Sequence, residues 1–250
     1  MRVVTGTEGV HERFALVTGA NKGIGFATAA GLGRLGNTVL IGARDEHRGA
    51  EAVARLCDEG VDARLLLLDI ADDASVCRAA HEVETSVGRL DILVNNAAIK
   101  LEAAPSPPSA CSLAMVRETF ETNVFGSIRV LLAMLPLLRR SDAPRIVNVS
   151  SGLGSLTLAA TEGTKYSQRP LLSYNVSKAA LNSATVQFAN ELRGTAFKVN
   201  AADPGYTLTD MTGGGVRVPE KAAAVVIRLA TLPADGPSGR FFDEHGELPW

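Results

Sequence analysis

A tyrosine and a lysine four residues apart in the chain could together transfer a proton. The segment 174–178 (YNVSK) opens a predicted helix, and its spacing places Tyr174 and Lys178 on one helical face. A free phenol has a pKa of about 10, and a neighbouring ammonium lowers that pKa because it favours the phenolate. The pair could therefore exchange a proton near neutral pH, although a surface pair on an amphipathic helix would show the same spacing.

A glycine-rich segment, 18–25 (TGANKGIG), lies between the first predicted strand and the first predicted helix. Glycines permit a tight turn and a close approach of the backbone to a pyrophosphate, whose charge then meets the free N–H groups of the helix. Such a turn is weak evidence alone, but its position in a βαβ unit strengthens it. It predicts a dinucleotide site formed by Gly19, Asn21, Lys22, Gly23, Ile24 and Gly25.

The end of the second predicted strand indicates which nucleotide is bound. NAD sites usually have a carboxylate there, whereas this chain has Ala43 followed by Arg44. Arg44, Arg48 and Lys22 could surround a 2′-phosphate, and a neutral Ala43 would not repel it. The pattern favours NADPH/NADP+. The alternative is that both arginines are only solvated charges and that Asp45 binds the ribose of NAD.

No metal site is predicted, because the four histidines are isolated from possible ligands. The three cysteines are far apart and without a C-x-x-C pair, so we expect reduced thiols in a cytoplasmic protein. A net charge of −2 and scattered arginines and lysines give no reason to expect nucleic acid or a membrane surface as partner. The longest apolar run, 128–138, is interrupted and too short to span a bilayer.

Short apolar runs alternate with helical patterns along the whole chain. Val-, Ile- and Leu-rich strands that alternate with helices predict a parallel sheet covered on both faces. We expect one α/β domain over 1–250, a single-domain Rossmann fold with a doubly wound parallel sheet of about seven strands and helices on both faces. Residues 1–13 are a polar N-terminal extension. The strands are expected at 14–18, 38–42, 63–68, 90–94, 145–149, 198–201 and 241–242.

Taken together, these motifs resemble the short-chain dehydrogenase/reductase family from about Phe14 to the C-terminus. The resemblance rests on the glycine-rich segment, on Asn95-Asn96-Ala97-Ala98, on Asn123, on Ser150-Ser151, on Tyr174 with Lys178 and on Pro204-Gly205, all in the family's order. The segments 17–25 and 43–48 and the terminal Trp250 look most like its NADPH carbonyl-reductase branch.

The resemblance implies a catalytic role for four residues. Tyr174 would protonate the carbonyl oxygen, and Lys178 would lower the pKa of Tyr174 and hold the nicotinamide ribose. Ser151 would donate a hydrogen bond to the same oxygen, where negative charge develops. Asn123 would anchor a water of a proton relay through its helix backbone. Ser150, the neighbour of Ser151, is expected only to cap a turn.

The resemblance also implies contacts with the cofactor. Asp69 matches the position that contacts adenine, Asn95 lies beside the nucleotide, and Thr209 is expected near the carboxamide. The remaining cofactor contacts are Ile70, Ala97, Tyr174, Pro204, Gly205 and Thr207. The chain departs from the family pattern at Ala98, where glycine is usual, and at Thr207, where valine or isoleucine is common.

The predicted activity is an NADPH-dependent reduction of a ketone, aldehyde or quinone. The substrate is expected to be a mostly apolar small molecule, bound among the loops 99–111, 152–170 and 206–218. An NAD-dependent alcohol dehydrogenase on the same scaffold is the alternative, and a non-catalytic NADP-sensing protein is a more distant one.

The segment between Ser151 and Tyr174 is longer than in most of the family. Its residues 161–170 are polar, and we expect them to shield the surface of the helix from Leu171 to Arg193. A monomer is therefore favoured, with a dimer or tetramer as the alternative.

Overall fold

An eight-stranded sheet forms the centre of the computed structural model, which describes residues 12–250. The strand order is β3-β2-β1-β4-β5-β6-β7-β8, and every neighbouring pair is parallel except β7 and β8. The strands are β1 Arg13–Thr18, β2 Asn37–Ala43, β3 Ala63–Leu67, β4 Ile92–Asn95, β5 Arg145–Val149, β6 Lys198–Ala202, β7 Phe241–Phe242 and β8 Glu247–Leu248. The predicted doubly wound Rossmann sheet is confirmed.

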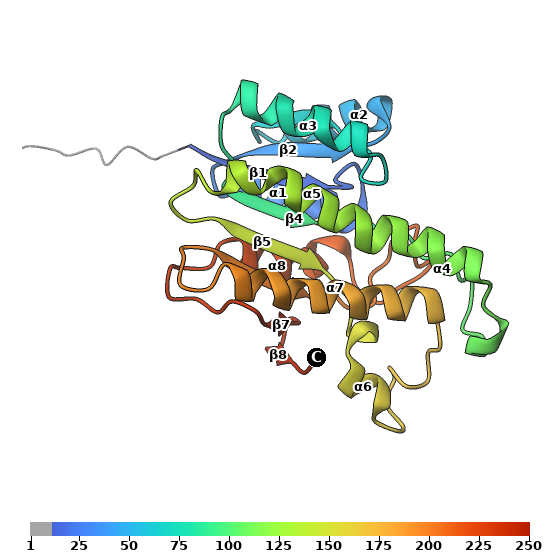
Figure 1. The fold of residues 1–250 in the computed structure, drawn as a ribbon. Coiled ribbons are helices and arrows are strands. Elements are labelled where there is room, and N and C mark those ends of the chain that lie inside the picture. Colours follow the sequence, from blue (N-terminus) through green and yellow to red (C-terminus); the bar gives the residue numbers. More distant parts are fainter. Residues whose placement is uncertain (1–11) are drawn as a thin grey trace, which may run out of the picture.

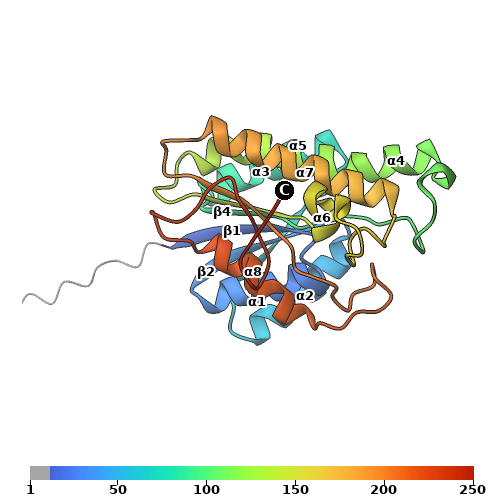
Figure 2. The same ribbon diagram turned by 90° about the horizontal axis from the view of Figure 1, so that it is seen from below.

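Helices cover both faces of this sheet, as Figures 1 and 2 show. They are α1 Gly23–Arg34, α2 Glu46–Asp58, α3 Asp73–Ser86, α4 Leu113–Phe120, α5 Ser127–Leu138, α6 Leu156–Ala160, α7 Leu172–Glu191 and α8 Pro219–Ala230. Two short 3₁₀ turns, η1 Pro108–Ala110 and η3 Gly152–Gly154, and a π-helical segment, η2 Glu121–Gly126, complete the elements.

The apolar core lies in two layers, one on each side of the sheet. Helices α3, α5 and α7 pack on one face, around buried side chains such as Leu93 and Met134. Helices α1, α2 and α8 pack on the other face, around side chains such as Ile41 and Val226. Because both faces are covered, the central strands are buried along their whole length, as the continuous apolar runs predict.

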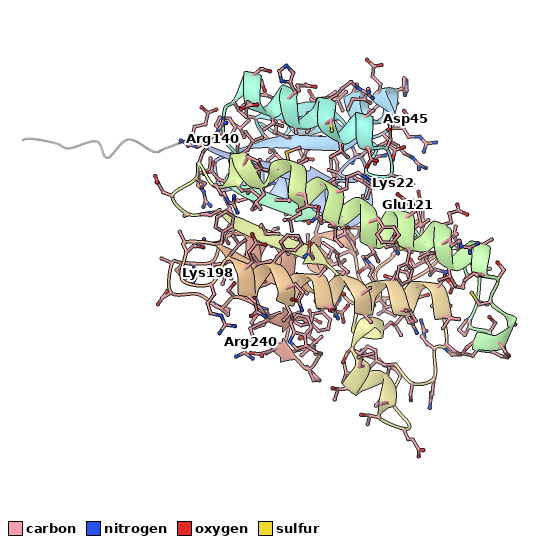
Figure 3. All side chains as sticks on the ribbon, viewed as in Figure 1. Lys22, Asp45, Glu121, Arg140, Lys198 and Arg240 are labelled. Atoms are coloured by element: carbon pink, nitrogen blue, oxygen red, sulfur yellow. The ribbon has the colours of Figure 1, made fainter. Side chains whose placement is uncertain are left out.

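The strand order reverses between β1 and β4, and ligands of doubly wound sheets bind where it does so, at the carboxyl ends of the strands. Figure 3 shows Lys22 and Asp45 at this end of the molecule and Arg140 and Lys198 at the opposite end. The loops after β1, β4, β5 and β6 therefore position the candidate site.

Several predicted strand ends differ from the structure by one or two residues, and one strand was missed. β1 begins at Arg13, which was assigned to the N-terminal extension; the extension's residues 1–11 lie outside the described part of the chain. β4 begins at Ile92 rather than at residue 90, where the Phe14 amide donates to the side chain of Asp91 rather than to a backbone carbonyl. The antiparallel strand β8 was not predicted, since two residues show no periodicity.

The stretch Leu113–Leu138, formed by α4, η2 and α5, is long and apolar enough to cross a membrane by length and composition alone. A little over half of its most apolar window, 56%, is buried inside the protein. Helix α5 packs on the sheet between α3 and α7, and core helices of water-soluble proteins pass the same test.

The C-terminal residues fold back on α6. The Trp250 ring stacks on Phe241, with 5.6 Å between the ring centroids, and the Trp250 carbonyl accepts a hydrogen bond from the Thr157 amide at 2.9 Å. The Pro249 carbonyl accepts a hydrogen bond from Ser155 Oγ at 2.8 Å. The tail thus supports the short helix that follows the active-site strand β5.

Candidate active site

The turn between β1 and α1 has the backbone geometry of a phosphate cradle. Gly19 and Gly23 have φ values of 63° and 58°, which favour glycine. A Cβ on Gly25 would lie 2.5 Å from the Gly19 carbonyl oxygen, so a side chain there would fill the turn. Helix α1 starts after Lys22 with no side-chain cap among the described residues, which leaves its first N–H groups free for an anion.

This turn is fastened to the loop after β4 by residues to which the sequence assigned no role. Thr18 Oγ1 accepts hydrogen bonds from the amides of Asn96 and Ala97, at 2.9 and 3.0 Å. Asn96 Nδ2 donates to the carbonyls of Thr18 and Gly19, at 2.8 and 3.2 Å. Asn96 therefore shapes the cradle from outside. Its place in the Asn-Asn-Ala-Ala motif was the signal that could have identified it.

An open pocket of about 690 Å³ adjoins the cradle on the side of α2. Lys22 and Arg48 line this pocket, as predicted for a 2′-phosphate site, together with Asp210. Arg44 is exposed beside them but does not line it. Asp45, the alternative ribose ligand, accepts a hydrogen bond from the Arg48 amide at 3.0 Å and caps α2, which lowers the pKa of its carboxyl.

Asp210 was not predicted to lie at this pocket. Its carboxylate pairs with Lys22 Nζ at 2.6 Å, and both side chains are exposed. The contact joins the glycine-rich turn to the loop 206–218, which is 188 residues further along the chain. Thr209 reaches the same turn, since its Cγ2 would lie 3.4 Å from a Cβ on Gly23.

Three other predicted cofactor contacts lie beside the cradle in different environments. Asp69 is partly exposed and accepts a hydrogen bond from the Ala71 amide at 3.0 Å. Ile70 is buried and packs against η2, where it leaves no space for a side chain on Gly126. Asn95 is buried, and its Nδ2 donates to Asn148 Oδ1 at 2.9 Å, so its side chain joins β4 to β5.

Helix α7 and the end of β5 bring the predicted catalytic side chains together. The Ser151 side chain lies near that of Tyr174 and acts to lower the pKa of its phenol. Ser151 also caps η3 by accepting from the Leu153 amide at 3.2 Å. Lys178 is 2% exposed, and its Nζ donates to the Val149 carbonyl at 2.7 Å and lies 5.7 Å from the centre of the Tyr174 ring.

The electrostatics of Tyr174 differ from the prediction. Burial raises the pKa of Tyr174 well above its usual value, and the negative charge of Asp203 raises it further, whereas the nearby Ser151 side chain lowers it. Burial also lowers the pKa of Lys178 to about 8. Lys178 is not among the groups that act on the pKa of Tyr174 here, and its buried Nζ is hydrogen-bonded to the Val149 carbonyl instead.

Asn123 lies in the π-helical segment η2 and is fully buried. Its Oδ1 accepts from the Ile99 amide at 2.8 Å, and its Nδ2 donates to the Ile99 carbonyl at 2.9 Å and to Ser177 Oγ at 3.0 Å. Widened helical turns of this kind occur often at functional sites. Asn123 thereby connects the loop after β4 to the helix that contains Tyr174.

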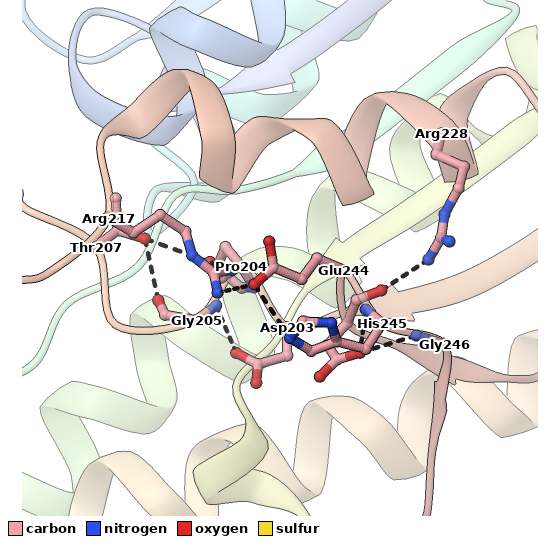
Figure 4. A network of polar contacts seen from close by, with 10 residues as sticks. Asp203, Pro204, Gly205, Thr207, Arg217, Arg228, Glu244, His245 and Gly246 are labelled. Carbon is pink, nitrogen blue, oxygen red and sulfur yellow. Dashed lines mark hydrogen bonds and ion pairs between the residues drawn. The ribbon is translucent and has the colours of Figure 1, made fainter.

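The turn after β6 is held by its own backbone and by Arg217. Gly205 has a φ of 73°, and its amide donates to Asp203 Oδ1 at 2.9 Å. Arg217 Nη1 donates to the Pro204 carbonyl at 2.9 Å, and the same guanidinium pairs with Glu244 (Figure 4). Thr207 is 1% exposed and donates to the Gly205 carbonyl at 3.0 Å, so its hydroxyl is used inside the turn.

Asp203 is a functional candidate that the sequence analysis missed. Its carboxyl is buried, accepts from the Gly205 amide, lies close to Gly152, and acts electrostatically on Tyr174. Burial raises the pKa of Asp203, while the amides of Gly205 and Gly152 lower it. An aspartate directly before Pro-Gly was visible in the sequence, but nothing in its spacing indicated that it would face Tyr174.

The long segment between Ser151 and Tyr174 reaches the site. The Tyr166 ring packs against Gly152, where a Cβ would lie 2.4 Å from it. The Arg169 guanidinium lies 4.9 Å from the centre of the Tyr206 ring, so this segment also contacts the loop 206–218. Ser150 donates to Asn182 Oδ1 at 2.6 Å and ties β5 to α7, a structural role like the one expected for it.

Comparison with known proteins agrees with this geometry. Residues 13–217 match the family model described as short chain dehydrogenase. The (+)-neomenthol dehydrogenase of Arabidopsis thaliana is 37% identical and carbonyl reductase (NADPH) 1 of Mus musculus 33% identical; these alignments cover 92% and 94% of this chain and 95% and 98% of the relatives. The NADPH-bound carbonyl reductase from chicken fatty liver superposes with a TM-score of 0.82 at 29% identity, over 96% of this chain and 99% of that one.

A Rossmann sheet with a glycine turn after β1, and with a tyrosine, a serine and a lysine grouped at the end of β5, is the arrangement of an oxidoreductase. The chain belongs to the short-chain dehydrogenase family, and its relatives place it near the carbonyl-reductase branch.

Proposed function

We propose that this protein is an NADPH-dependent reductase that converts a carbonyl group of a small molecule to an alcohol. The observation that supports it most directly is the grouping of Tyr174 with Ser151, which acts on its pKa, and with Lys178, whose Nζ lies 5.7 Å from the centre of the Tyr174 ring. Relatives named carbonyl reductase and salutaridine reductase support the same reaction class.

The residues at the end of β1 fit a dinucleotide. A side chain at Gly25 would fill the cradle, and the first N–H groups of α1 have no side-chain cap within the described residues. Lys22 and Arg48 at the adjoining pocket, and the exposed Arg44, supply the positive charge that a 2′-phosphate requires. The cap formed by Asp45 on α2 supports NADPH over NAD, because a capping carboxylate is less available to a ribose hydroxyl.

When bound, NADPH supplies the hydride that reduces the carbonyl carbon. Tyr174 donates its phenolic proton to the carbonyl oxygen, and Ser151 donates a hydrogen bond to the same oxygen as its negative charge develops. The raised pKa of Tyr174 keeps the phenol protonated before the reaction, and it also makes the phenol a weaker acid. Lys178, with a pKa of about 8, exchanges its own proton near neutral pH and is suited to restore that of Tyr174.

The substrate is proposed to be a mostly apolar carbonyl compound in a cytoplasmic setting. The loops 99–111, 152–170 and 206–218 meet at the carboxyl end of the sheet, and the contact of Arg169 with Tyr206 joins two of them.

The protein is proposed to act as a monomer. The partly exposed segment 161–170 supports this, since it lies against the first turns of α7 together with Pro108.

A screen of ketones, aldehydes and quinones for NADPH oxidation tests the proposal. We expect turnover with at least one apolar carbonyl compound, and no turnover by a Tyr174→Phe variant on the same compound. Absence of NADPH binding in a direct titration would contradict the proposal. Tighter binding of NADH than of NADPH would favour the NAD-dependent alcohol dehydrogenase instead.

A further inference from the structure

The helix that contains Tyr174 begins without a cap of its own. Its N-cap position is Leu171, whose side chain cannot accept a hydrogen bond. The first amides of a helix have no partner inside the helix, and leaving them buried and unpaired costs free energy. Ser173, in the first turn of α7, is fully buried, so solvent cannot satisfy its amide.

The missing cap comes from Glu102, in the loop that follows β4. Glu102 Oε1 accepts hydrogen bonds from the amides of Ser173 and Tyr174, at 2.6 and 3.3 Å. The side chain is 5% exposed, and these hydrogen bonds lower the pKa of its carboxyl although burial acts to raise it. A carboxylate at a helix N-terminus is also stabilised by the helix dipole.

Tyr174 is therefore held from both sides of its backbone. Its amide donates to Glu102, and its carbonyl accepts from Ser177 Oγ at 2.7 Å. Ser177 Oγ in turn accepts from Asn123, which also binds both the amide and the carbonyl of Ile99 in the same loop as Glu102. The loop after β4 thus contacts the first turn of α7 through two separate routes.

We propose that Glu102 is a positioning residue for Tyr174, which fixes the first turn of α7 so that the phenol meets Ser151 and the substrate oxygen. It acts through the backbone of α7 and does not touch the substrate itself. Proton donation depends on the phenol lying within hydrogen-bond reach, and small misplacements of a catalytic group reduce turnover strongly. The expected fall in kcat rests on the proposed carbonyl reduction, whereas the contact of Glu102 with the first amides of α7 does not.

Three variants separate the parts of the inference. Glu102→Ala removes the acceptor, Glu102→Gln keeps an oxygen at the same reach without the charge, and Glu102→Asp keeps the charge on a shorter side chain. In Glu102→Ala we expect the amides of Ser173 and Tyr174 to exchange hydrogen roughly fivefold faster or more, because the cap is lost. We expect its kcat to fall at least about tenfold, with the Kd for NADPH changed by less than about threefold.

Glu102→Gln should recover most of the kcat and of the amide protection, whereas Glu102→Asp should not. Asp91 provides the matched control, since it is equally buried at 5% and also accepts from a backbone amide, that of Phe14, at the opposite end of the sheet. Asp91→Asn should lower the Tm and leave kcat unchanged. If Glu102→Ala does not fold, the comparison of Glu102→Gln with Glu102→Asp tests the positioning role instead.

The contact would be refuted if the amides of Ser173 and Tyr174 exchanged hydrogen at the wild-type rate in Glu102→Ala. If that variant does not fold, the same result in Glu102→Asp would refute it. Faster exchange with an unchanged kcat would overturn the positioning role. A wild-type protein that reduces no carbonyl compound while the amides respond as expected would refute the proposed function and leave the cap in place.

Discussion

Tyr174 is the residue on which the proposed chemistry depends most. Tyr174→Phe removes the phenolic proton but keeps the ring, so we expect kcat to fall by at least a hundredfold, in the range that general acids contribute. The Kd for NADPH should change by less than about threefold, because the main cofactor contacts are proposed at the glycine cradle and not at the phenol. Steady-state kinetics and a direct NADPH titration measure the two effects. Turnover within tenfold of the wild type would refute the assignment.

Asp203 should tune the protonation of Tyr174. The charged groups that face this site are Lys178, Asp203, and, acting on Asp203, Lys165 and Asp243. The charge of Asp203 raises the pKa of Tyr174, so Asp203→Asn should lower that pKa. Reduction needs the protonated phenol and is lost as pH rises through its pKa. The variant should therefore lose reduction at a lower pH than the wild type does.

The reverse reaction gives an independent check of Asp203. Oxidation of the alcohol needs the phenolate, so Asp203→Asn should oxidise the alcohol product faster than the wild type at neutral pH. The profiles of kcat/KM against pH in both directions measure these shifts. Identical profiles for the variant and the wild type would show that Asp203 acts only on the backbone of Gly205 and Gly152.

The sequence identified the side chains that perform the chemistry, but not those that position them. Tyr174 and Lys178 were found because their types and their spacing on one helix are informative by themselves. Glu102 and Asp203 act across loops that meet only after folding, and Glu102 caps a helix that starts about 70 residues away. Local sequence patterns do not predict hydrogen bonds between residues that are so far apart in the chain.

At the scale of single elements, the junction of β2 and α2 should set the cofactor preference. Ala43→Asp combined with Arg44→Ala would place a carboxylate at the strand end and remove an exposed guanidinium. We expect the ratio of the Kd values for NADH and NADPH to move at least tenfold toward NADH, through repulsion of the 2′-phosphate. Titration of both cofactors tests this. Equal affinities in the wild type would contradict the NADPH assignment.

The strands and most helices follow from apolar periodicity, because the sheet is buried on both faces and its helices are amphipathic. The π-helical segment at Asn123 could not be predicted in this way, since it differs from an α-helix by one extra residue in a turn. The start of β4 was also displaced, at the point where the side chain of Asp91, and not a backbone carbonyl, accepts from the Phe14 amide.

At the scale of the whole molecule, assembly is the open prediction. The segment 161–170 lies against only the first turns of α7, and Val176 remains 44% exposed. Phe125 and Leu132, near α5, are 51% and 55% exposed. We nevertheless expect light scattering to give a single mass near 26.2 kDa over a concentration series. A stable mass of two or four times this value would show that the segment does not cover the interface.

The fold of the C-terminal residues onto α6 has a spectroscopic consequence. Trp250 is the only tryptophan of the chain, and its ring is stacked on Phe241 at the base of the segment that leads from Ser151 to Tyr174. Indole emission is absorbed by reduced nicotinamide, so quenching of this one fluorophore should report cofactor binding without any label. During denaturation, the fluorescence of Trp250 should change when its ring leaves Phe241. This change should show whether the C-terminal residues and α6 unfold before the rest of the sheet or together with it.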